Sequence, residues 1–440
     1  MSKKKISKCL VLAAALFAAV SSYAQEGAYT GFTPYSIFGI GDINNPGSAY
    51  HRGMAGVGIA TRNNGYFNYL NPAAVTARDS LSFMADMSVS ESNKYLAQGD
   101  MRSSGNTFNI TDLAISFPIY RSSAFMVGIT PYSSTGFKYA YILDDPYIVG
   151  NTGHAMYSSI GNGGVNKIFA AAGVTFFKRL SLGVEGQYYF GSIYKNSAFT
   201  FAKAAYSGIS TGTDVHLRAK SAKFGLQYEQ PVGQKVKIGV GATYSLGANL
   251  TGQVDNYKIA TGSSQNDTIS FRSDTLGLTT RALSIPTELG LGLSINYSDV
   301  WRAEFNYTRS DWTSSGMDIV DGFAVVGSSV FSTRMSESYR AGFEIIPNAN
   351  DIRYYLKRCT YRAGVYYQKS YYAVDGNQVD DYGLTLGASL PVFRLSNAVN
   401  FAVELGQRSS RVGNMIRERY VNFTVGFNFY DLWFRKTQYQ

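Results

Sequence analysis

Apolar and polar residues alternate with a period of two through much of this 440-residue chain. The pattern is clearest from Tyr420 to Tyr430, where every second residue is Val or Phe and the residues between them are Asn, Thr or Gly. Successive side chains of a β-strand point to opposite faces, so the pattern predicts strands with one apolar face. The other face carries mostly Gly, Ser, Thr and Asn with scattered Arg and Glu, as expected for the lumen of a membrane β-barrel.

Fourteen segments carry this alternation, and we expect each to form a strand. They lie at residues 81–89, 108–118, 123–132, 167–177, 180–190, 214–229, 235–246, 281–296, 299–310, 334–346, 360–372, 379–391, 397–407 and 417–430. An even number of strands lets both ends of a closed barrel lie on one side of the membrane. The sequence therefore predicts an all-β, 14-stranded antiparallel transmembrane β-barrel over residues 81–430, followed by a periplasmic tail at 431–440.

The connections between these segments alternate in length. Short turns are expected near residues 120–121, 178–179, 231–233, 298 and 395–396, and long loops at about 90–107, 133–166, 191–213, 247–280 and 311–333. Short periplasmic turns opposite long external loops are typical of bacterial outer-membrane barrels. The 347–359 connection is longer than its periplasmic neighbours and does not fit this alternation.

The N-terminus has the features of a secretory signal. Lysines precede an apolar run from Cys9 to Val20 that is too short to span a bilayer, and a small-x-small pattern ends at Ala24. We expect residues 1–24 to be a signal peptide and the mature chain to reside in the outer membrane of a Gram-negative cell. Only Cys359 would then remain, which excludes an internal disulfide and leaves a buried or lumen-facing thiol.

Composition agrees with export to the outer membrane. The chain has 34 Tyr, 27 Phe and 45 Gly, and only 16% of its residues are charged. The mature part contains no apolar stretch near the eighteen or so residues that a membrane helix needs. Composition alone also fits a soluble all-β periplasmic protein, and the alternation described above favours the membrane barrel.

A 14-stranded barrel is too wide for its strand side chains alone to fill, so we expect residues 25–80 to form a hatch inside the lumen. Asn71-Pro72 is a good helix start, because Asn caps free N–H groups and Pro fits the first helical position. Glycines in the preceding segment would let its backbone turn tightly or approach the wall closely. The residues assigned to the hatch and its gating are Arg52, Gly53, Gly56, Gly58, Asn71, Pro72 and Ala73.

Charged residues recur on the polar faces of the predicted strands. An unpaired charge facing lipid at mid-bilayer would cost about 2–4 kcal/mol, so we assign these residues to the lumen: Glu185, Glu288, Arg302, Glu304, Arg340, Glu344, Arg362 and Glu404. They could form structural pairs that hold the plug or close the pore. Alternatively, one of the arginines could bind a substrate carboxylate.

The N-terminal third of the chain resembles a known family. The run Arg52–Ala60, the Asn71-Pro72-Ala73 helix start and the strand entry at Ser80–Phe83 resemble FadL-type long-chain fatty acid transporters and their aromatic-hydrocarbon relatives. The loop at 158–166 and the tail resemble variants from Bacteroidetes-type bacteria. The chain departs from the family pattern where ten residues follow Tyr430, because such barrels usually finish on a terminal aromatic residue.

This resemblance implies a 14-stranded barrel with a movable hatch and a sideways exit for hydrophobic cargo where the third strand kinks inward. That kink would fall between Thr130 and Gly136. Pro131 lacks a donor for the ladder and Gly136 weakens a strand, so these two residues are candidates for the lateral opening. Pro131 could instead simply end the strand at the rim.

Residues with catalytic or metal-binding chemistry are scarce. The histidines, His51, His154 and His216, lie far apart without HxxxH or HExxH spacing, so we expect no metal and no cofactor. His154 lies near Ser158 and Asp144-Asp145, but GxSxG is missing, and we expect no catalytic residue and no enzymatic activity. Basic residues are too dispersed for a nucleic-acid surface.

The sequence therefore predicts a monomeric outer-membrane channel for passive uptake of hydrophobic, fatty-acid-like small molecules, gated by the hatch. Its expected partners are outer-membrane lipid, the hydrophobic substrate and the outer-membrane assembly machinery. Two alternatives remain open: a non-transporting barrel that acts as a docking or shuttle component of a secretion system, and a general polar porin.

Overall fold

The computed structural model describes residues 30–79, 81–120, 122–143, 145–203, 205–261, 266–276, 283–320, 322–324, 329–392, 397–409 and 415–432. The predicted signal peptide at 1–24 and most of the predicted tail at 431–440 lie outside these ranges. Among the described residues, no helix has the length and apolar character needed to cross a membrane.

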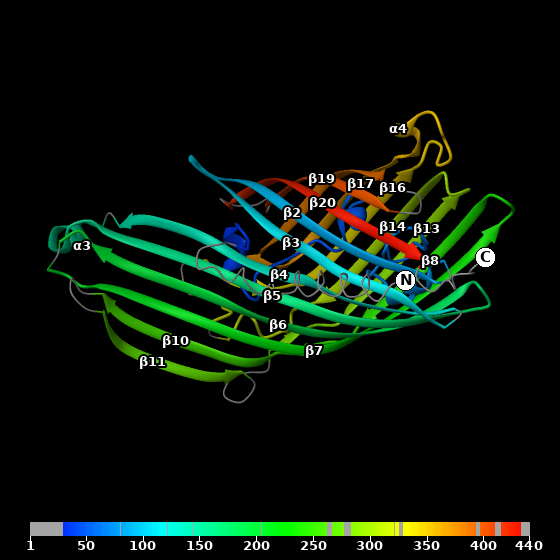
Figure 1. Ribbon diagram of the computed structural model, residues 1–440. Helices are drawn as coiled ribbons and strands as arrows, with labels where there is room; N and C mark the ends of the chain where they lie inside the picture. The colour runs from blue at the N-terminus through cyan, green and yellow to red at the C-terminus, as the bar shows by residue number, and fades with distance from the viewer. Residues whose placement is uncertain are drawn as a thin grey trace, which may run out of the picture.

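The chain forms a closed 14-stranded antiparallel β-barrel, as predicted (Figure 1). Each strand pairs with the next around the wall, and the last strand pairs with the first. The strands are β2 (Ser82–Gln98), β3 (Met101–Tyr120), β4 (Ser123–Leu143), β5 (Ala155–Phe176), β6 (Leu180–Phe201), β7 (Gly208–Val232), β8 (Val236–Ser245), β13 (Glu288–Tyr297), β14 (Trp301–Asp311), β16 (Met335–Ile345), β17 (Thr360–Val374), β18 (Asn377–Pro391), β19 (Ala398–Ser409) and β20 (Arg417–Leu432).

Several strands are much longer than predicted, and three of the expected long loops are largely strand. The regions 90–107, 133–166 and 191–213 mostly continue β2 to β7, with the short helix α3 (Pro146–Thr152) between β4 and β5. β7 alone has 25 residues, whereas about 9–11 suffice to cross a membrane. These extensions are rich in Ser, Gly and Asn. Apolar and polar residues alternate only weakly in them, so their sequences resemble loops.

The remaining external segments also hold local structure. β10 (Thr251–Thr261) and β11 (Asn266–Leu276) form a hairpin that continues the sheet beside β7. β9 (Ala248–Asn249) pairs with β12 (Ser284–Ile285), and β15 (Phe331–Thr333) pairs with β17. The predicted strand at 281–296 begins at Glu288 instead. The 347–359 connection contains the helical turn α4 (Tyr355–Arg358).

The outer face of the wall is apolar and the inner face polar, as the alternation predicted. On β13 the exposed apolar residues are Leu289, Leu291, Leu293 and Ile295, at 38–49% exposure. The residues between them, including Ser294 and Asn296, are buried inside the barrel. Burying the polar face and leaving the apolar face exposed is the reverse of a soluble sandwich, and it fits a barrel surrounded by lipid.

The N-terminal segment lies inside the barrel, as Figure 1 shows in blue. This hatch, residues 30–79, consists of η1 (Pro34–Ile37), β1 (Asp42–Ile43), α2 (Ala49–Arg52), η2 (Pro72–Thr76) and connecting turns. Its elements are short, and they pack both against the wall and against one another, as where the Tyr50 ring stacks on that of Tyr66. β1 pairs with Ser133 and Ser134 of β4, which makes the hatch continuous with the wall at that point.

Candidate functional site

Asn71 joins the hatch to the wall. Its side chain caps η2 by accepting a hydrogen bond from the Ala73 N–H at 3.0 Å, as predicted, although η2 is a 3₁₀ turn and not an α-helix. Its amide nitrogen donates to the carbonyl of Ile59 at 2.8 Å and to that of Leu226 on β7 at 3.1 Å. One fully buried side chain therefore satisfies donors and acceptors of both hatch and barrel.

Glycines of the wall allow the hatch to approach the strands. A Cβ added to Gly183 would lie 2.3 Å from the Pro72 carbonyl carbon, and one added to Gly225 would lie 2.1 Å from Asn71 Oδ1. Gly53 of the hatch meets Gly387 of β18 in the same way, with a built Cβ only 3.0 Å from the opposite Cα. Close packing along this surface depends on wall residues that lack a side chain.

A buried ion-pair cluster surrounds α2. Tyr50 of α2 donates to Glu344 at 2.5 Å, and Arg362 pairs with the same carboxylate at 3.0 Å. The Arg362 guanidinium also lies 4.0 Å from the centre of the Tyr50 ring, and Arg302 is 3.7 Å from Glu344. Burial and the Glu344 charge raise the pKa of Tyr50, so its phenol stays a donor. This cluster stabilises the hatch from three neighbouring strands.

Backbone groups of the hatch are bound by lumen side chains in a second region. Glu304 on β14 accepts from the Ala60 N–H at 2.9 Å and from the Thr61 hydroxyl. Arg62 of the hatch donates to Ser181 on β6 at 2.6 Å and to Gln227 on β7 at 3.2 Å. Without such partners these buried polar groups would cost about 1–3 kcal/mol each.

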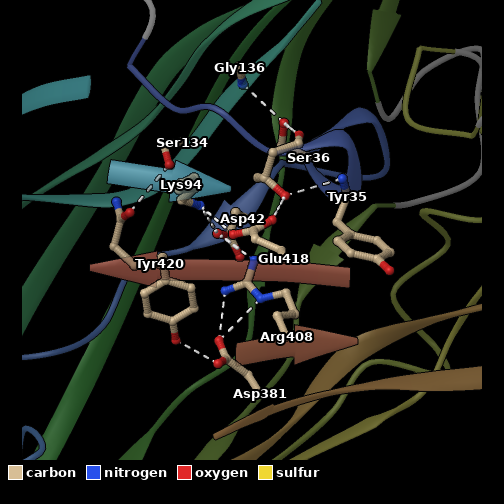
Figure 2. A network of polar contacts seen from close by, with 12 residues as sticks. Tyr35, Ser36, Asp42, Lys94, Ser134, Gly136, Asp381, Arg408, Glu418 and Tyr420 are labelled. Carbon is tan, nitrogen blue, oxygen red and sulfur yellow. Dashed lines mark hydrogen bonds and ion pairs between the residues drawn. The ribbon is translucent and has the colours of Figure 1, made fainter. Parts of the chain in front are cut away.

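The outer half of the lumen contains a further polar network, shown in Figure 2. Asp42 of the hatch pairs with Arg408 on β19 at 2.7 Å, and Arg408 also pairs with Asp381 on β18 at 2.8 Å. Lys94 on β2 pairs with Glu418 on β20 at 2.8 Å. Three carboxylates and two cations are thus connected between the hatch and four strands, and each ion has a partner of opposite charge.

An apolar cluster closes the barrel above these networks. Phe38 and Ile40 of the hatch pack with Trp312, Met317 and Phe323, which belong to the segment between β14 and β15. These side chains are almost completely buried, with exposures of 0–2%. Within the predicted external loop at 311–333, the described residues 312–320 and 322–324 therefore fold inward as a second plug layer.

The wall loses its pairing between β3 and β4. The two strands pair from Tyr120↔Ser123 only as far as Leu113↔Ile129. Beyond that point β4 continues to pair with β5, with a register shift between Pro131 and Ser133. The hatch occupies part of the gap, because Thr33 N–H donates to the Gly136 carbonyl at 2.7 Å. The break in pairing begins at Thr130 on β4, and Pro131 lies within a continuous strand and does not end it.

A cavity of about 560 Å³ lies at this break. Its walls come from the hatch, from the inner faces of β2, β3, β19 and β20, and from Pro131 and Ser133 on β4. Phe190 and Ser192 of β6 also line it, and they alternate with the inward-facing Tyr189 and Ile193. The cavity thus connects the outer surface of the wall with the lumen network around Lys94 and Arg408.

Half of the residues that line the cavity are Ser, Thr or Asn: Thr30, Asn44, Asn45, Ser90, Ser92, Thr107, Asn109, Thr111, Ser133, Ser134, Asn166, Ser192 and Asn422. Asp42, Arg52, Lys94 and Arg408 add charge. This lining favours a molecule with a polar end over a plain hydrocarbon, because an apolar group would leave these polar groups without water.

Of the sequence-predicted hatch residues, Gly53, Asn71, Pro72 and Ala73 lie directly against the wall. Arg52 bonds within the hatch, to the carbonyls of Gly47 and Asn45, each at 3.1 Å, and borders the cavity. Gly56 has φ +77°, a conformation that glycine adopts readily. A Cβ built on Gly58 would meet His51 and Leu70 of the hatch. Gly136 contacts Gly31 at the lateral break.

Seven of the eight predicted lumen charges are buried inside the barrel: Glu185, Arg302, Glu304, Arg340, Glu344, Arg362 and Glu404. Arg340 donates to the Ala55 carbonyl at 2.9 Å, and Glu404 accepts from Asn45 at 2.7 Å. Glu288 differs, because it lies at the first residue of β13 and is exposed. Sequence reasoning missed Asp42, Lys94, Asp381, Arg408 and Glu418.

Other predicted features can be placed as well. Cys359 is buried and forms no disulfide. His51 is buried in the hatch, His154 lies between α3 and β5, and His216 lies on β7. Among the described residues, no group of three or more His, Cys, Asp or Glu side chains is arranged to hold a metal ion.

Comparison with known proteins gives one family and several structures. A family model described as BamG matches residues 3–440, and a search of curated proteins finds no match. Similar solved structures include the CymD monoaromatic hydrocarbon channel (15% identity, TM-score 0.58, covering 89% of this chain and 98% of that one). A Pseudomonas aeruginosa FadL homologue has 12% identity, TM-score 0.61 and coverage of 88% and 99%.

The P. putida toluene transporter TodX is similar to the same degree, with 12% identity, TM-score 0.57 and coverage of 89% and 100%. At these identities the likeness establishes a shared fold. The FadL-like barrel with an N-terminal plug, which the resemblance in the sequence implied, is therefore confirmed.

Proposed function

The chain belongs to the BamG family, and we propose that it is an outer-membrane channel for passive uptake of hydrophobic, fatty-acid-like small molecules, gated by its hatch. The observation that carries the proposal is the break between β3 and β4 above Leu113↔Ile129, with its cavity of about 560 Å³. Several proteins of the same fold are described as hydrocarbon channels or toluene transporters.

The cargo would reach the bilayer sideways. Lipid-facing side chains surround the break, and Phe108 on β3 is 63% exposed beside it. The polar lining of the cavity favours amphipathic cargo, in which one end forms hydrogen bonds and the other is apolar. For entry from outside, the hatch and the inward-folded segment around Trp312 would have to shift, because together they fill the lumen.

The test is uptake of radiolabelled lauric acid and of radiolabelled toluene by cells with and without the gene. We expect deletion to lower laurate uptake at least fivefold and the plasmid-borne gene to restore it. A smaller effect on toluene would agree with the polar cavity. Equal laurate uptake by the two strains would exclude the channel function.

A second candidate is a non-transporting barrel that docks other proteins at the outer membrane. The observation that favours it is the sealed lumen, in which the Tyr50–Glu344 hydrogen bond and the Asp42–Arg408 ion pair hold the hatch beneath a buried apolar layer. Whole-cell crosslinking followed by purification separates the two functions. Stoichiometric protein partners together with unchanged laurate uptake after deletion would support docking. The filled lumen argues against a general polar porin.

A further inference from the structure

The outer surface beside the lateral cavity combines two kinds of lipid-binding chemistry. On β6, Phe190 and Ser192 face outward and line the cavity. Their cross-strand partners on β7 are Arg218 and His216, and Lys220 lies opposite Tyr188. Directly opposed residues on antiparallel strands lie within about 5.5 Å of each other. The polar cavity therefore continues into a short row of basic side chains on the same face.

A contribution to stability does not explain the exposed positions of Arg218 and Lys220 on β7. Both are exposed, and their sequence neighbours Leu217 and Ala219 are buried inside the wall. Within the described part of the chain neither side chain forms an ion pair. An exposed Arg or Lys at the membrane midplane would cost about 2–4 kcal/mol, whereas the cost near the interface falls to about 0–1 kcal/mol. These residues therefore mark the level of the lipid headgroups.

The apolar surface below this level would take acyl chains. On β6, Val184 and Leu182 lie between the basic row and the short turn to β5, and they are 53% and 40% exposed. The short turns define the periplasmic side and the long hairpins the external side. A lipid of the outer leaflet would thus place its headgroup at the cavity and its chains along Val184.

We propose that the cavity and the adjacent row of Arg218 and Lys220 bind an outer-leaflet lipid whose headgroup is a phosphorylated sugar. The hydroxyl and amide groups of Asn166, Ser192 and their neighbours pair with the sugar hydroxyls. The two cations pair with phosphate, whose oxygens accept charge-assisted hydrogen bonds. Lys94 and Arg408 inside the cavity are already paired with carboxylates, so the phosphate binds at the rim. This site does not depend on whether the barrel transports cargo.

Native mass spectrometry of the purified full-length barrel tests the proposal. The protein in detergent is mixed separately with diphosphoryl lipid A, dephosphorylated lipid A, phosphatidylglycerol and free glucosamine 1-phosphate. We expect diphosphoryl lipid A to be retained at least fivefold more than phosphatidylglycerol or the free sugar phosphate. Dephosphorylated lipid A should lie between them, because it keeps the sugar contacts only.

Two variants locate the site. Asn166→Leu should lower retention of both forms of lipid A, and the double variant Arg218→Ser/Lys220→Ser should lower only that of the diphosphoryl form, each at least fivefold. Asn196→Leu, farther along the outward face of β6, and Arg309→Ser, at the outer end of β14, are matched controls that should bind like wild type. Heat-modified gel migration reports folding for each variant. Equal retention of all lipids by wild type, or wild-type binding by both site variants, would overturn the proposal.

Discussion

At the scale of single residues, contact between hatch and wall depends on the absence of side chains. Gly183 faces the hatch, and a Cβ there would lie 2.3 Å from the Pro72 carbonyl carbon. Gly186 is three residues farther along the same strand, and its built Cβ has no neighbour closer than 3.9 Å. The sequence shows how many glycines the strands contain. Which of these glycines contact the hatch depends on strand register, which the sequence does not give.

Replacing Gly183 with Val should separate η2 from the wall. Overpacking of this kind typically costs about 1–3 kcal/mol, and we expect faster hydrogen exchange for residues 59–78. Gly186→Val is the control, because it adds the same side chain to the same strand facing away from the hatch. The comparison is made by hydrogen–deuterium exchange and by the urea midpoint. Equal exchange in the two variants would contradict the close contact.

His51 makes the hatch sensitive to acid. Burial, helped by the nearby charge of Arg362, lowers the pKa of His51 from 6.5 to about 3. The folded state therefore binds fewer protons than the unfolded state between these values, so stability falls as pH decreases from about 6.5 towards 3. We expect the urea midpoint of wild type to fall between pH 7.5 and pH 4.5, and that of His51→Gln to fall less. Identical pH dependence of the two proteins would contradict this assignment.

At the scale of elements, the alternation of apolar and polar residues predicted where the strands lie. It did not predict how long they are. All fourteen barrel strands were predicted because lipid on one side and a polar lumen on the other impose period-two patterning. Outside the membrane that constraint ends, so the extensions of β4 to β7 lack a strong pattern. The ion-pair partner of Asp42 was not predictable either, because Arg408 is more than 300 residues away in the sequence. A single charged residue on the polar face of a strand does not indicate which other charge it will pair with.

The segment before β1 fits into the lateral break because Gly136 has no side chain. A Cβ at Gly136 would lie 1.7 Å from the Gly31 carbonyl oxygen, so Gly136→Ala should displace residues 30–34 while leaving β4 paired with β5. We expect faster hydrogen exchange of this segment and no change in the exchange of β5. Gly150→Ala in α3, where a Cβ meets nothing within 4 Å, is the control. Unchanged exchange of residues 30–34 would show that Gly136 does not hold them.

The network in Figure 2 should behave as one unit. Arg408→Met leaves the buried Asp381 without its cation and the half-buried Asp42 with only Lys94, at 3.9 Å, and removing one partner of a buried pair costs about 3–5 kcal/mol. The triple variant Arg408→Met/Asp42→Asn/Asp381→Asn removes the stranded charges as well and should recover much of that loss. Urea unfolding measures both. A triple variant less stable than Arg408→Met would argue against coupling.

At the scale of the whole molecule, the barrel is closed twice, by a polar hatch and by an apolar outer layer. The sequence predicted the hatch, since a wide barrel needs a filling and residues 25–80 were left over. It did not predict the outer layer, because Trp312 and Phe323 lie in a segment that reads as an external loop. Whether such residues fold inward depends on contacts with Phe38 and Ile40 from the other end of the chain.

A closed barrel should conduct few ions. We expect wild-type protein in planar bilayers to show almost no conductance, and a variant that lacks residues 30–78 to show a large, steady conductance. Heat-modified migration confirms that the truncated barrel is folded. A large conductance of wild type would mean that the hatch and outer layer leave an open aqueous path.

The most direct test of the hatch as a gate is to lock it in place. A Cβ built on Gly426 of β20 lies 2.7 Å from the Ala49 Cβ in α2, so α2 must move outward by about 1 Å for a disulfide, whose Cβ atoms lie about 3.5–4.5 Å apart, to form there. Cells with Ala49→Cys/Gly426→Cys are assayed for uptake of labelled laurate before and after reduction, beside each single cysteine variant. We expect uptake to be blocked when the bridge is oxidised and restored when it is reduced. Uptake that is the same in both states, with the bridge shown to have formed, would contradict a channel gated by the hatch.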